Sequence, residues 1–129
     1  MGGYTKQNLI QVEDAAPRFG MPDGLEARFA RSAIEGHELG LSLFRLAPKV
    51  RIPFGHKHAG QEEVYVVVKG SGRIKVEDEV VELSQWDAIR IDKDTMRNME
   101  AGPDGIEYLA FGAGDDPTEV EMAQHWWSD

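Results

Sequence analysis

A chain of 129 residues with 41% hydrophobic and 29% charged side chains has the size and composition of one folded domain, which excludes a disordered or fibrous protein. The formal net charge of -9 opposes phosphate backbones and anionic lipid, so we expect neither a nucleic-acid nor a membrane partner. The sequence shows no signal peptide and no apolar run of ~20 residues, which predicts a cytoplasmic location. Because cysteine is absent, any metal must be held by His, Asp or Glu.

The hydrophobic pattern predicts a series of short β-strands along the chain. Apolar residues alternate with polar or small ones over 25–29 and 39–43, which is typical of a hairpin of half-buried strands. Further strands are expected over 64–68, 73–77, 80–83, 88–91 and 106–111. Two turn-forming sequences separate the last two of these strands, 88–91 and 106–111. They are DKDT from Asp92 and AGPDG from Ala101. A helical period is visible only over 118–125, so the sequence predicts an all-β sandwich or barrel.

The two ends of the chain are the least patterned segments. We therefore expect one domain over 1–129, with a core at about 25–112, an irregular N-terminal arm over 1–24 and an irregular C-terminal tail over 113–129. Trp126 and Trp127 in the tail are unlikely to stay in solvent, so we expect them to pack against the barrel or a partner subunit. The alternative is that they cover a ligand pocket.

One segment carries side chains that could hold a metal ion. His56 and His58 lie two residues apart, so on a strand both imidazoles project from the same face. Glu63 follows after four residues and begins an apolar strand on which it shares a face with Tyr65, whereas Glu62 should face the other side. Two imidazoles and a carboxylate suit a divalent transition ion and leave coordination positions open for water or substrate.

The spacing of this segment resembles the first signature motif of the cupin superfamily. The motif reads His-x-His, four residues, Glu, six residues, Gly, and it is matched by His56, His58, Glu63 and Gly70. The resemblance covers roughly 39–111 and includes the run VYVVVKGSG. It implies a single cupin-type, jelly-roll-like β-barrel in which His56, His58 and Glu63 bind manganese, iron, nickel, copper or zinc. It also implies a small-molecule ligand and, together with the aromatic tail, a homodimer.

The segment that aligns with the second cupin motif differs at the residue that should complete the metal site. In WDAIRIDKDTMRNMEAG, Asp87 stands in its usual place, but Arg97 occupies the position of the histidine ligand. A guanidinium group stays protonated and has no lone pair to offer, so Arg97 cannot bind a metal. Either Arg97 lies beyond the ion and binds an anionic group of a substrate, or it pairs with Glu63 in a metal-free site. Tyr65 could help to orient the ligand.

Two classes of function follow from these residues. The first is a metal-dependent enzyme acting on a small anionic or polyhydroxylated molecule, for which the resemblance implies an isomerase, a dioxygenase or a lyase. The second is a small-molecule-binding or structural module that uses an Arg97–Glu63 pair and has no catalytic activity. The sequence assigns no general base, so the catalytic residues stay unknown. His37 and His125 are expected at the surface, without a role.

Overall fold

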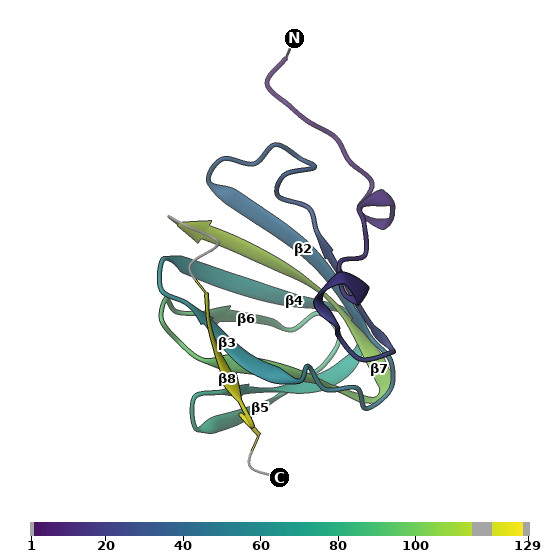
Figure 1. Ribbon diagram of the computed structural model, residues 1–129, viewed down its shortest axis with the longest axis vertical. Coiled ribbons are helices and arrows are strands. Elements are labelled where there is room, and N and C mark those ends of the chain that lie inside the picture. The colour runs from purple at the N-terminus through teal and green to yellow at the C-terminus, as the bar shows by residue number, and fades with distance from the viewer. Residues whose placement is uncertain (1, 115–119, 128–129) are drawn as a thin grey trace.

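A computed structural model describes residues 2–114 and 120–127 of the chain (Figure 1). Two short 3-10 helices, η1 (Leu9–Gln11) and η2 (Pro17–Phe19), precede the first strand. The strands of the described residues are β1 (Leu25–Phe29), β2 (Leu39–Leu46), β3 (Phe54–His58), β4 (Gln61–Val76), β5 (Glu79–Leu83), β6 (Ala88–Ile91), β7 (Arg97–Gly114) and β8 (Val120–Gln124). No helix in these residues has the length and apolar character needed to cross a membrane.

All of these strands belong to one antiparallel sheet that curls on itself. Along its main path the order is β1-β2-β7-β3-β8, and β4 pairs with β5, β6 and β7. Figure 1 shows β8, in yellow, beside β3, with which it pairs from Phe54 to His58. The long strands β4 and β7 pair along most of their length, with irregularities in register between Val67 and Lys69 and between Gly70 and Gly72. The all-β prediction is therefore confirmed.

The inner face of the curled sheet carries the hydrophobic core. Alternating side chains of β4 and β7 supply its centre, where Val67 and Ile74 are fully buried and Met99, Ile106 and Tyr108 are 2% exposed. The same alternation continues toward the beginning of β4, where Tyr65 is buried as well. The inward face of β4 thus passes without interruption from the core to Glu63.

Several predicted boundaries were wrong. The strands expected over 64–68 and 73–77 are parts of the single strand β4, and the turn expected at AGPDG lies inside β7. In place of a turn, the pairing of β4 with β7 is locally irregular, and the chain bends there. Gly70 and Gly105 adopt positive φ angles of 77° and 82° at this bend. A Cβ at Gly70 would lie 2.1 Å from the Gly105 carbonyl oxygen, so only glycine fits there.

The prediction of a helix over 118–125 was also wrong for the residues that the structure describes. Residues 118 and 119 lie outside the described residues, and 120–124 form strand β8. The reason is a non-local interaction, because β8 pairs with β3, a strand more than sixty residues earlier in the chain.

Both ends of the described chain contact the sheet. In the N-terminal segment, the Asp14 carboxylate accepts hydrogen bonds from the backbone N–H groups of Ala16 and Ala27, each at 3.0 Å. At the other end, the Trp126 ring packs on the backbone of Gly55, where an added Cβ would lie 2.7 Å from its Cγ. The Lys75 ammonium group lies 4.7 Å from the centre of the Trp126 ring.

The last described residue, Trp127, lies against two arginines. The guanidinium carbons of Arg51 and Arg73 are 4.3 Å and 4.9 Å from the centre of its ring. Cation–π contacts of this kind favour an aromatic side chain at a charged surface. The prediction that the two tryptophans pack against the barrel is thus confirmed.

Candidate metal site

Three strands position the side chains that the sequence analysis singled out. His56 and His58 lie on β3, Glu63 and Tyr65 lie near the beginning of β4, and Arg97 is the first residue of β7. His56 is paired with Arg97 in the register of β3 and β7, which brings the arginine to the two histidines. The period of two places each pair of strand residues on one face, as predicted.

The side chains of His56, His58 and Glu63 converge on one region. One potential ligand atom from each residue lies within 4.8 Å of those from the other two. The two imidazole rings are 5.2 Å apart between centroids, in an edge-to-face arrangement, and His58 Nε2 is 3.7 Å from Glu63 Oε1. The His58 and Glu63 side chains are each 13% exposed. The structure therefore brings together the three residues that the sequence proposed as ligands.

Arg97 forms an ion pair with Glu63 at this site. Its Nη2 donates to Glu63 Oε1, its Nε donates to the Tyr65 hydroxyl at 3.1 Å, and its Nη1 donates to the Thr95 carbonyl at 2.9 Å. The Tyr65 hydroxyl in turn donates to Glu63 Oε1 at 3.1 Å. Both partners thus hold the same carboxylate oxygen, and Glu63 Oε2 accepts no hydrogen bond from the residues that the structure describes.

The surroundings keep both imidazoles neutral near pH 7. Burial, followed by the nearby charges of Arg97 and His58, lowers the pKa of His56 to about 3. Burial also lowers the pKa of His58, and Arg97 acts in the same direction, against the opposing effect of Glu63. The neutral ring is the form that can donate a nitrogen lone pair to a metal.

The pKa of the Tyr65 hydroxyl is shifted in the other direction. Burial raises this pKa above its usual value, and the charge of Glu63 adds to the effect. The hydroxyl is therefore protonated at ordinary pH, so it can donate to Glu63.

The donor set fits a divalent transition ion. It combines two neutral imidazoles with a carboxylate that has one oxygen free, a combination that zinc, iron and similar ions accept. In addition, the His58 Nδ1 is buried and has no hydrogen-bond partner among residues 2–114 and 120–127. An orphaned ring nitrogen at this place is consistent with a role in binding. The nearby positive charge of Arg97 opposes an ion, but Arg97 is directed at Oε1 and leaves Oε2 available.

The other residues considered from the sequence lie outside this cluster. Glu62 faces the opposite side of β4, where its half-exposed side chain pairs with Arg90 at 3.1 Å. His37 and His125 are exposed, as expected.

Sequence reasoning missed Gln61, the first residue of β4, which is 4% exposed. The available signal was its position two residues before Glu63, on the same face of the same strand. That position alone does not distinguish a buried amide from a surface one.

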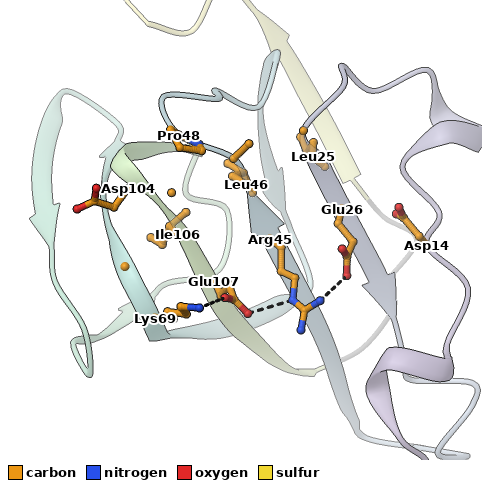
Figure 2. A pocket seen from close by; sticks show the side chains of 14 residues that line it. Asp14, Leu25, Glu26, Arg45, Leu46, Pro48, Lys69, Asp104, Ile106 and Glu107 are labelled. Carbon is orange, nitrogen blue, oxygen red and sulfur yellow. Dashed lines mark hydrogen bonds and ion pairs between the residues drawn. The ribbon is translucent and has the colours of Figure 1, made fainter.

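A cavity of about 430 Å³ lies elsewhere on the molecule, beside β1, β2 and β7 (Figure 2). Figure 2 shows Arg45 between Glu107, at 3.0 Å, and Glu26, at 3.5 Å, while Lys69 lies 3.8 Å from Glu107. These charges neutralise one another, and none of the metal-site residues lines the cavity. The cavity and the histidine cluster are therefore separate features of the molecule.

Comparisons with known proteins agree with the motif. A family model described as the cupin domain matches residues 42–105, about half of the chain, including His56, His58, Glu63 and Arg97. No curated protein matches. Among solved structures, a cupin protein from Bacteroides fragilis is 24% identical, with a TM-score of 0.72 over 92% of this chain and 91% of that chain.

Two further structural neighbours carry individual protein names. KdgF from Halomonas sp. is 21% identical, with a TM-score of 0.58 over 74% of this chain and 85% of that one. Oxalate decarboxylase from Bacillus subtilis is 19% identical, with a TM-score of 0.75 over 97% of this chain, which spans 33% of the decarboxylase. At these identities the likeness shows the fold alone. The matched family model, the shared fold and the histidine motif together show that this chain belongs to the cupin superfamily.

Proposed function

We propose that this protein binds a divalent transition metal, manganese, iron, nickel, copper or zinc, through His56, His58 and Glu63, and that it acts on a small anionic or polyhydroxylated molecule at that site. The observation that carries the proposal is the convergence of the three ligand atoms within 4.8 Å. A bound ion would supply the positive charge that polarises an oxygen of the ligand. Isomerase, dioxygenase and lyase activities are the reaction classes that we propose to test.

The residues around the cluster support this proposal by holding Glu63 in place. Arg97 and Tyr65 fix one carboxylate oxygen, so the other oxygen is oriented before any ion arrives. We further propose that Arg97 stands in place of the usual fourth ligand and, with Tyr65, contacts the ligand. A guanidinium group has more N–H donors than the three contacts described above engage, so donors remain for an anionic group.

One structural neighbour supports the choice of a small anion. Oxalate decarboxylase is named for its action on oxalate, a small dicarboxylate, and it shares the fold over nearly all of this chain. The cationic Arg97 beside the cluster would favour an anionic ligand.

The metal content of protein purified without chelator tests the proposal. We expect about one ion per chain after loading with manganese, iron, nickel, copper or zinc. Glu63→Ala should lose the ion, whereas the matched control Glu62→Ala should keep it, because Glu62 faces away and pairs with Arg90. Failure of the folded wild-type protein to bind any of these ions would overturn the proposal.

A second candidate function is a metal-free binding or structural module. It is favoured by one observation, the ion pair between Glu63 and the fully buried Arg97, which places a positive charge next to the carboxylate without a metal. In this case, a ligand should still bind after chelation and should be lost in Arg97→Ala. The metal-dependent function requires the opposite response to chelation.

We also propose that the protein forms a homodimer. Leu39 and Phe111 are 63% and 41% exposed on the neighbouring strands β2 and β7, an apolar surface that a second copy would cover. Light scattering should give twice the mass of one chain, and Leu39→Lys should shift the protein toward the monomer. A wild-type protein that is monomeric at all accessible concentrations would overturn this proposal. The cytoplasmic location stays a prediction.

A further inference from the structure

Gln61 is a buried polar residue to which the proposed function so far gives no role. It begins β4, and its side chain is 4% exposed. Its amide atoms are not among the fully buried polar atoms without a partner in the described part of the chain, so they keep some access to solvent. The amide is therefore available to contact an ion or a ligand at the site.

The Gln61 side chain lies beside the free oxygen of Glu63. Gln61 and Glu63 are two residues apart on β4, so their side chains leave the same face of the sheet. Gly112 stands opposite Glu63 on β7. A Cβ built at Gly112 would lie 3.2 Å from Gln61 Oε1 and 3.5 Å from Glu63 Oε2. Both oxygens therefore border the same small space, which Gly112 leaves open.

The two carboxylate oxygens of Glu63 have different neighbours. Arg97 and Tyr65 donate to Oε1, whereas Oε2 accepts nothing from the described residues. On the side of Oε2, the side-chain oxygen of Gln61 borders the same space, next to Gly112. Two acceptor oxygens at one place favour a cation or a hydrogen-bond donor between them.

We infer that the side-chain oxygen of Gln61 is a further protein ligand of the ion, supplied from β4 because Arg97 cannot act as the fourth ligand. The inference rests on the proposed metal-dependent function. An amide oxygen is neutral, so it adds a donor without adding to the negative charge of the site. A set of two nitrogens and two oxygens is harder than the set of three histidines and one glutamate that the two cupin motifs supply, so it should favour Mn²⁺ and Fe²⁺ more than that set would.

The experiment compares Mn²⁺ binding to the full-length wild-type protein and three variants by titration calorimetry. Gln61→Met keeps the length of the side chain and removes the amide, and we expect its affinity for Mn²⁺ to fall by about ten-fold or more. Gln61→Glu restores an oxygen at the same place and should bind within about three-fold of the wild type, or more tightly. The control Gln85→Met changes an exposed glutamine at the turn before β6 and should bind as the wild type does.

A second readout reports on the coordination sphere itself. Loaded with Co²⁺, Gln61→Met should show a visible absorption spectrum different from that of the wild type, which a loss of stability alone would not produce. Equal Mn²⁺ affinities and identical Co²⁺ spectra in Gln61→Met and the wild type would overturn this inference and leave the proposed function intact. A folded wild-type protein that binds no ion would instead overturn the proposed function, and this inference with it.

Discussion

Replacing Arg97 with methionine should reveal how strongly the buried ion pair supports the fold. The Arg97 side chain is 1% exposed and that of Glu63 is 13% exposed, so water screens their interaction poorly. The substitution removes the charge that faces Glu63 and the donors to Tyr65 and Thr95. Methionine fills much of the remaining space, so the electrostatic loss should dominate.

Removing one partner of a buried ion pair costs about 3–5 kcal/mol. Because part of the Glu63 side chain still reaches solvent, we expect the lower end of that range, about 3 kcal/mol, in the metal-free protein. A divalent ion would restore the lost positive charge beside Glu63. At a concentration 100 times Kd, binding adds about 2.7 kcal/mol, so a metal should recover most of the loss. It should stabilise Arg97→Met more than the wild type, in which the guanidinium repels the ion.

Urea unfolding followed by tryptophan fluorescence, with and without Mn²⁺, measures these quantities. The control is Arg90→Met, which breaks the exposed pair with Glu62 and should cost much less than Arg97→Met, because water screens that pair. If Arg97→Met were no less stable than this control without metal, the ion pair could not be a strong constraint on the site. If Mn²⁺ stabilised the variant less than the wild type, the electrostatic account of Arg97 would be refuted.

Three further substitutions test other features. His56→Ala should abolish the binding of about one ion per chain, measured by elemental analysis, while the exposed His37→Ala keeps it. Trp126→Ala removes the ring packed on β3 and should lower the free energy of unfolding by about 2 kcal/mol. The control Trp86→Ala, at a 69% exposed residue, should change the free energy of unfolding by less than about 0.5 kcal/mol. Equal effects of the two substitutions would contradict the packing of Trp126. Gly70→Ala should cost about 3 kcal/mol or more by thermal unfolding, because its Cβ would lie 2.1 Å from a backbone oxygen; a stable variant would contradict the bend.

The sequence was sufficient for features that depend on local periodicity. The hydrophobic pattern placed β1, β5 and β6 within one residue of their observed bounds, since each is a short strand rich in apolar residues. The same period of two placed His56 and His58 on one face and separated Glu63 from Glu62. The spacing of the motif then brought the histidines and Glu63 together correctly, because the intervening turn is short.

Features that depend on contacts between distant segments could not be predicted in this way. The strand β7 continues through AGPDG because β4 runs opposite it, although these residues favour turns when considered alone. The residues of β8 show a weak helical period, which pairing with β3 overrides. The sequence left open whether Arg97 binds an anionic group of a substrate or pairs with Glu63. The fold brings the Arg97 guanidinium to Glu63, 34 residues earlier in the chain. The position of the Gln61 side chain next to Glu63 and Gly112 likewise depends on the fold.

The way β3 is held has a consequence for the order in which the protein assembles. Strand β3 carries His56 and His58, yet within residues 2–114 and 120–127 it pairs with β7 at His56 alone, whereas it pairs with β8 along all of its length. Among the described strands β8 is synthesised last, so β3 has few backbone partners before that segment has left the ribosome. His56 and His58 should therefore be among the last of the described residues to become ordered, and an ion would be captured after the core has formed.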